Sequence, residues 1–125
     1  MRVTAIPLIG ALCALVGMTI LNTSAQGITD PVARGKYLVM SAGKCADCHG
    51  EQLQGGALDF LKPGMPVAYA APKIAGLPQL SSAAATTFLQ SGMLPGGKQA
   101  RPPMPQYRFN HDDAAAIVAY LKSLK

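Results

Sequence analysis

The chain has 125 residues, of which 50% are hydrophobic, and it carries a formal net charge of +5 at pH 7. A chain of this length supports one domain. Its Lys and Arg residues are scattered singly, with no basic run or stripe, so the composition argues against a nucleic-acid-binding protein.

The first 25 residues have the pattern of a secretory signal peptide. Arg2 is followed by an uncharged run of 16 residues, Ile6 to Leu21, and then by the small residues Thr23 and Ala25 before a cleavage point after Ala25. The run is slightly shorter than the roughly 20 apolar residues of a membrane-spanning helix. We therefore predict a signal peptide over residues 1–25 and a periplasmic domain over residues 26–125. The alternative is an uncleaved anchor over residues 6–21, and only in that case would the protein be held at a membrane.

A first helix is predicted to begin at Asp30 and Pro31, which are a favourable N-cap and first helical residue. It is expected to run to about residues 41–44 and to deliver Cys45 at its end. Its apolar face recurs at helical spacing, at Gly35, Leu38, Val39 and Ala42.

Gly and Pro recur between residues 50 and 79 too often for long regular elements, so this stretch predicts an irregular loop region. One short helical turn is expected around Leu58–Leu61. No β-strand is predicted anywhere in the chain. Loops this long in a small domain indicate that something other than chain packing, such as a cofactor, organises them.

A second helix is predicted over Ser82–Ser91, with Ser81 or Ser82 as its cap and Gly92 as its end. A last helix is predicted after Asn110, where acidic residues in the first turn and lysines in the last turn complement the helix dipole. Its apolar stripe consists of Ile117, Tyr120, Leu121 and Leu124. Tyr37 and Phe88 are expected in the core. The fold class is therefore all-α, with three to four helices and long loops.

The segment "CADCH", residues 45–49, contains the residues that predict a cofactor site. Two cysteines separated by two residues and followed at once by histidine form the pattern of covalent c-type haem attachment. Cys45 and Cys48 would add to the two vinyl groups of one porphyrin, and His49 would reach the iron of the same ring. The sequence therefore predicts one covalently bound haem c.

Three other interpretations of these residues are weaker. A disulfide between Cys45 and Cys48 would close a very small loop and stabilise little. A thioredoxin-like redox pair needs a βαβ setting, and no strand is predicted before it. A zinc site needs two further ligands, and the other histidine of the chain, His111, is expected to be a solvated residue in the first turn of the last helix.

On these residues the chain resembles the class I, small monohaem cytochromes c. The resemblance implies that Cys45 and Cys48 carry the thioether bonds and that His49 is the proximal axial ligand. "APKIAGL", residues 71–77, is similar to the "GPxLxG" segment of that family, in which the proline carbonyl accepts a hydrogen bond from the ligating histidine. Pro72 would then orient His49. The family also has crossing terminal helices, which would bring Gly35 close to Tyr120.

The segment "PPMPQY" resembles the loop of this family that bears the distal methionine, so Met104 would be the sixth ligand. The prolines on both sides of Met104 stiffen the loop, which lowers the entropy lost when a weak thioether ligand binds. Met65 and Met93 are the competing thioethers, and Met40 is expected in the core. Because the chain has no Trp to donate to a haem propionate, Tyr107 and Arg101, with Tyr69, are the candidate haem contacts.

His/Met ligation fills both axial positions and leaves no site for a substrate. The predicted function is that of an exported electron carrier, not an enzyme, which passes single electrons between redox protein partners such as a dehydrogenase, an oxidase or another cytochrome. Lys44, Lys73 and Lys98 either steer an acidic partner or are ordinary solvated residues. The first alternative is a haem c subunit of a larger dehydrogenase or oxidase complex, served by the long loop of residues 50–71. The second is a ligand-binding or peroxidase-like haem protein with an open iron.

Overall fold

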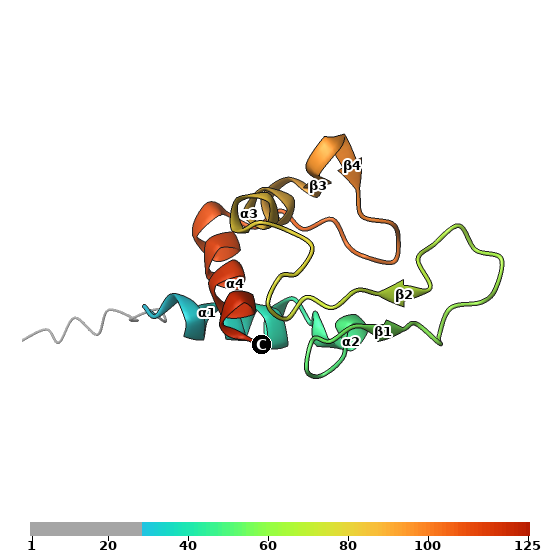
Figure 1. Ribbon diagram of the computed structural model, residues 1–125, viewed down its shortest axis with the longest axis horizontal. Helices are drawn as coiled ribbons and strands as arrows, with labels where there is room; N and C mark the ends of the chain where they lie inside the picture. The colour runs from blue at the N-terminus through green and yellow to red at the C-terminus, as the bar shows by residue number, and fades with distance from the viewer. Residues whose placement is uncertain (1–28) are drawn as a thin grey trace, which may run out of the picture.

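The computed structural model describes residues 29–125, and the predicted signal peptide lies outside these residues. Helices α1 (Pro31–Tyr37) and α4 (His111–Ser123) cross at one side of the molecule, with α3 (Ser82–Ser91) beside α4 (Figure 1). The irregular segment of residues 58–69 extends away from these helices (Figure 1). The described part of the chain is predominantly helical, as the sequence predicts.

Helix α1 spans Pro31–Tyr37. The Asp30 carboxylate caps it by accepting hydrogen bonds from the backbone amides of Val32 and Ala33, at 3.3 and 3.0 Å. The helix then widens into a π-helical turn, η1, over Leu38–Ala42. The predicted end at residues 41–44 is therefore correct in position, but the last turn is not α-helical.

Glycine permits this wide turn. The Gly43 amide donates to the Leu38 carbonyl at 2.6 Å, and a Cβ on Gly43 would lie 2.9 Å from that carbonyl oxygen. Lys44 follows with a positive φ of 49°, which redirects the chain. Cys45 therefore does not end the first helix and instead serves as the N-cap residue of a separate short helix, α2, over Ala46–His49.

Helix α3 begins and ends where the sequence predicts, whereas α4 begins as predicted but ends at Ser123, so that Leu124 and Lys125 lie outside it. Helix α3 spans Ser82–Ser91; the Ser81 hydroxyl accepts from the Ala84 amide, and Gly92 ends the helix in the left-handed conformation. Helix α4 spans His111–Ser123, and the Asn110 side chain accepts from the Asp113 amide at 2.8 Å.

Four two-residue strands form two minimal antiparallel ladders, which the sequence did not predict. β1 (Gly56–Ala57) pairs with β2 (Ala70–Ala71). β3 (Met93–Leu94) pairs with β4 (Lys98–Gln99) across the 3₁₀ turn η2 (Pro95–Gly97). Strands of two residues are too short to show an alternating pattern. Between β1 and β2 the expected helical turn at Leu58–Leu61 is a single hydrogen-bonded turn and not a helix.

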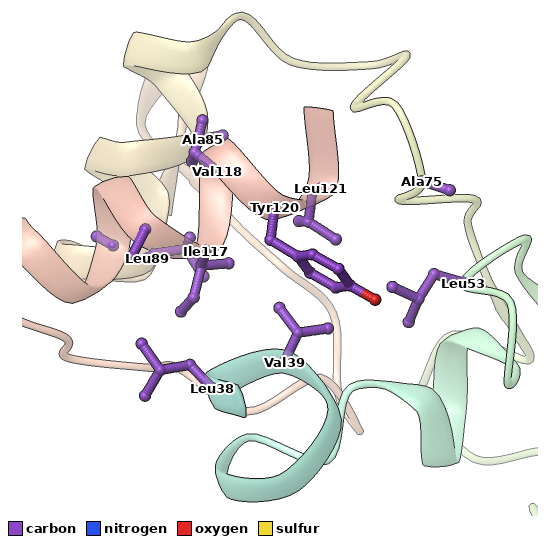
Figure 2. Close-up of a cluster of buried hydrophobic side chains, with 12 residues drawn as sticks. Leu38, Val39, Leu53, Ala75, Ala85, Leu89, Ile117, Val118, Tyr120 and Leu121 are labelled. Atoms are coloured by element: carbon purple, nitrogen blue, oxygen red, sulfur yellow. The ribbon is translucent and has the colours of Figure 1, made fainter. Parts of the chain in front are cut away.

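The core lies between α1, η1, α3 and α4, and Figure 2 shows Tyr120 of α4 pointing between Val39 and Leu53. Gly35 allows the two terminal helices to cross, because a Cβ there would lie 2.0 Å from the Ala116 carbonyl oxygen and 2.7 Å from the Tyr120 Cβ. The expected approach of Gly35 to Tyr120 is confirmed. Arg34 and Asp113 form an ion pair between the same helices at 2.5 Å.

Two aromatic residues, Tyr37 and Phe88, are expected in the core, and the expectation for Tyr37 is wrong. Phe88 is half-buried against the core, whereas the Tyr37 side chain is 54% exposed. Tyr37 is the last residue of α1, directly before the chain widens into the π-helical turn. The apolar face of the helix therefore passes through Gly35, Leu38 and Val39, which are buried, and leaves Tyr37 at the surface.

Candidate haem site

The short helix α2 carries the CxxCH residues. Its hydrogen bonds hold the turn closed: the His49 amide donates to the Cys45 carbonyl at 2.8 Å, and the Cys45 amide donates to the Val39 carbonyl at 2.9 Å. Side chains three and four residues apart lie on one face of such a turn, so Cys45, Cys48 and His49 share a face. Both cysteines are half-buried free thiols, and burial raises the pKa of the Cys45 thiol above its ordinary value.

His49 is the one polar residue in the buried core of the described chain, with a side chain only 6% exposed. Its Nδ1–H donates to the Pro72 carbonyl at 2.7 Å. Because a carbonyl only accepts, this bond selects the tautomer with the proton on Nδ1 and leaves a lone pair on Nε2. The ring makes no other hydrogen bond within residues 29–125, so Nε2 is free to bind a metal ion.

The turn after His49 brings Pro72 into place. The Gly55 amide donates to the His49 carbonyl at 2.8 Å, and the amides of Ile74 and Ala75 donate to the Leu53 carbonyl at 2.9 and 3.0 Å. A Cβ on Gly55 would lie 2.5 Å from the Ala71 carbonyl oxygen and 2.7 Å from the Pro72 carbonyl carbon. Sequence reasoning missed Gly55, since one glycine in a glycine-rich loop does not show which segment will pass over it.

Gly55→Ala is expected to lower the free energy of unfolding by about 2–3 kcal/mol, because φ is +80° there and the new methyl group meets the backbone of residues 71–73. It should also weaken the hydrogen bond from His49 to Pro72. Chemical unfolding followed by circular dichroism measures the first effect, and the NMR shift of the His49 Nδ1 proton measures the second.

The matched control is Gly64→Ala, where φ is +86° and no atom lies within 4 Å of the added Cβ. This variant carries the same backbone strain without the contact. Equal losses in the two variants, with an unchanged His49 signal, would contradict the role assigned to Gly55.

Met104 lies half-buried in an irregular loop after β4, which we call the Met104 loop and define as residues 100–107. A turn closes just before the thioether, where the Met104 amide donates to the Arg101 carbonyl at 3.2 Å. The competing methionines are placed differently. Met65 is 46% exposed, Met93 is half-buried in β3 with its sulfur 3.7 Å from Gln99 Nε2, and Met40 packs against the core.

The three candidate propionate donors make hydrogen bonds within the chain. The Tyr107 hydroxyl donates to the Gly43 carbonyl at 2.7 Å, and burial raises its pKa, which keeps it a neutral donor. Arg101 Nη2 donates to the Val67 carbonyl at 3.1 Å. The Tyr69 hydroxyl accepts from the Met65 amide and donates within its own loop. A phenol has one proton, so both tyrosines have theirs engaged in the structure.

The described residues do not support the other interpretations of the motif, a disulfide or a zinc site. No disulfide joins Cys45 and Cys48. Residues 29–125 contain no group of three or more His, Cys, Asp or Glu side chains placed to hold a metal ion. His111 is exposed in the first turn of α4, as expected. The donor set at α2 thus consists of two thiols and one oriented imidazole on one face, which fits a covalently attached haem.

Comparison with known proteins agrees with this donor set. The family model described as cytochrome c matches residues 32–125, and the chain belongs to that family. Its cofactor is covalently bound haem c, which accepts and releases single electrons. A chain of this kind carries electrons and does not catalyse a reaction with its own side chains.

Curated relatives share about a third of their aligned residues with this chain. They are described as the cytochrome c subunit of quinone alcohol dehydrogenase. The proteins from Gluconacetobacter polyoxogenes and Komagataeibacter europaeus are each 36% identical over 122 residues, covering 82% of this chain and 26% of the relative. The protein from Gluconobacter oxydans (strain 621H) is 32% identical over 120 residues, covering 79% and 25%. This chain thus spans about a quarter of the length of these relatives.

Proposed function

We propose that this protein is an exported electron-transfer protein whose single haem c is bound by Cys45 and Cys48 and ligated by His49 and Met104. The observation that carries the proposal is the buried His49 ring, whose Nδ1–H donates to the Pro72 carbonyl at 2.7 Å. This bond fixes the plane of the ring and increases the basicity of Nε2, which is what a permanent axial ligand needs. Pro72 is therefore the residue that orients the ligand.

Ligation of the iron by Met104 would make the protein an electron carrier. If His49 and Met104 both bound the iron, neither oxygen nor peroxide would have a place to bind, and the thioether would raise the reduction potential by favouring the ferrous state. Among the methionines, Met104 combines partial burial with a loop stiffened by Pro102, Pro103 and Pro105.

Export rests on the N-terminal sequence. Residues 1–25 have the order of charge, apolar run and small residues that a secretory signal needs, which would place the domain of residues 26–125 in the periplasm. Within residues 29–125 no helix is long and apolar enough to cross a membrane. N-terminal sequencing of the mature protein distinguishes cleavage after Ala25 from retention of residues 6–21 as an anchor.

The absorption spectrum tests the ligand set. The oxidised protein is expected to show the weak charge-transfer band of a thioether–ferric bond at about 695 nm, and the ferrous protein should bind CO only slowly. Absence of this far-red band together with rapid CO binding would contradict the carrier and would favour the alternative of an open-iron, ligand-binding or peroxidase-like protein.

A second candidate is a haem c subunit of a larger dehydrogenase complex, which the named relatives favour. The segment between β1 and β2, which we call the insertion loop and define as residues 58–69, extends away from the helices (Figure 1). Phe60, Met65 and Tyr69 on this loop are 66%, 46% and 41% exposed, so its large side chains are accessible to a partner.

The native size of the haem protein distinguishes the two candidates. A free carrier elutes from size exclusion of an unfractionated extract at the mass of one small domain, and its exposed Lys44 and Lys98 make partner binding sensitive to salt. A subunit comigrates with a large enzyme. Phe60→Ser should then release it, while Val32→Ser, at a 38% exposed site on α1, should not.

A further inference from the structure

We propose that Arg101 and Tyr107 are positioning residues for the sixth ligand, and that they hold the two ends of the Met104 loop against two different segments of the chain. This inference rests on the proposed ligation by Met104 and deepens it. The expectation that these two side chains contact haem propionates stays a separate prediction.

At the first end, the Met104 loop is bound to the insertion loop by two hydrogen bonds. Arg101 Nη2 donates to the Val67 carbonyl at 3.1 Å, and the Ala68 amide donates to the Pro102 carbonyl at 2.7 Å. Val67 is buried, so the segment that receives Arg101 is itself held in place. Arg101 is exposed, but its hydrogen bond to the Val67 carbonyl is partly buried.

At the other end, Tyr107 binds the segment that leads into the haem motif. Its hydroxyl donates at 2.7 Å to the carbonyl of Gly43, two residues before Cys45. Gly43 is fixed in turn, because its amide donates to the Leu38 carbonyl at 2.6 Å. The ring of Tyr107 stacks on Phe109 with centroids 5.0 Å apart, and the Phe109 amide donates to the Leu89 carbonyl of α3. The end of the loop is thus tied to both η1 and α3.

These contacts fix the position of the Met104 loop, which the prolines inside the loop cannot do. Pro102, Pro103 and Pro105 restrict the internal shape of the Met104 loop, but they do not place the loop relative to His49. A weak thioether ligand dissociates whenever the loop moves away, so the fraction of molecules with an open iron depends on the hydrogen bonds at the two loop ends. Loss of either bond should therefore increase that fraction and leave the helices intact.

The test is the affinity of imidazole for the ferric holoprotein, because imidazole must displace Met104 and its apparent affinity follows the open fraction. Tyr107→Phe and Arg101→Gln are each expected to raise this affinity about fivefold, the effect of losing one net hydrogen bond. The milder Arg101→Lys should give a smaller increase. The far-red band should also disappear at a lower temperature than the circular dichroism signal of the helices.

Tyr37→Phe is the matched control, since this tyrosine is 54% exposed at the end of α1, outside both loops, and loss of its hydroxyl should change the affinity by less than about twofold. Unchanged imidazole affinity in both Tyr107→Phe and Arg101→Gln would overturn the proposal, and a shifted pH dependence of the reduction potential in those variants would identify propionate contacts instead. A wild-type protein without the far-red band would overturn the Met104 ligation first, and this inference with it.

Discussion

Gly35→Ala is expected to lower the free energy of unfolding by about 3 kcal/mol or more. The added Cβ would lie 2.0 Å from the Ala116 carbonyl oxygen and 2.6 Å from its carbon, and both atoms belong to the backbone of α4. Backbone cannot move aside as a flexible side chain can, so the helices must separate. The helix propensity of Ala over Gly returns only about 1 kcal/mol.

The measurement is urea unfolding followed by circular dichroism, with Gly56→Ala as the control. Gly56 has no atom within 4 Å of an added Cβ and no positive φ, so its replacement should be close to neutral. Because α1 leads through η1 to Cys45, separation of the helices should also lower the yield of protein with attached haem. A loss below about 1 kcal/mol for Gly35→Ala would contradict the close crossing of α1 and α4.

Met104→Ala is expected to abolish the far-red band, to permit rapid CO binding, and to lower the reduction potential by about 100–300 mV. The reason is that the thioether favours ferrous iron, and its removal leaves water or a small ligand in its place. The chain should remain folded, because Met104 belongs to a half-buried loop outside the buried core cluster. Absorption spectroscopy and potentiometric titration measure these changes, and circular dichroism reports the fold.

Two controls identify the ligand. Met65→Ala removes an exposed thioether from the insertion loop and should leave the band and the potential unchanged. Met93→Ala tests the half-buried competitor beside α3. If the band survives in Met104→Ala and disappears in Met93→Ala, the assignment of the sixth ligand is wrong, while electron transfer by a His/Met haem would still stand.

The chain belongs to the cytochrome c family, and it is similar to about a quarter of the length of the named cytochrome c subunits. The insertion loop bears both on partner binding and on ligation of the iron by Met104. It exposes Phe60 and Met65, while its residues Val67 and Ala68 are hydrogen-bonded to the Met104 loop. The same segment that would serve a partner thus contacts the loop that carries the proposed sixth ligand.

Local chemistry was predictable from the amino acids alone. CxxCH at residues 45–49 indicates haem attachment because the two thiols and the imidazole must meet one ring, and this pattern is contained in five residues. The capping residues Asp30, Ser81 and Asn110 mark helix starts, since each satisfies amides within its own first turn. The close approach of Gly35 to the last helix was implied by the resemblance to the small cytochromes c, and the helical cost of a glycine at that position agrees with it.

Contacts between distant segments were decided only by the tertiary structure. The end of the first helix opens into a π-helical turn because Gly43 approaches Leu38, and Tyr37 is left exposed. The segment that passes over Gly55, and the carbonyls that receive Arg101 and Tyr107, lie many residues away in sequence. A donor's residue type states what it can bond to, but its actual acceptor depends on which segment packing brings within reach. The sequence of this protein therefore determines its cofactor and the starts of α1, α3 and α4, while the packed chain determines how the Met104 loop is held.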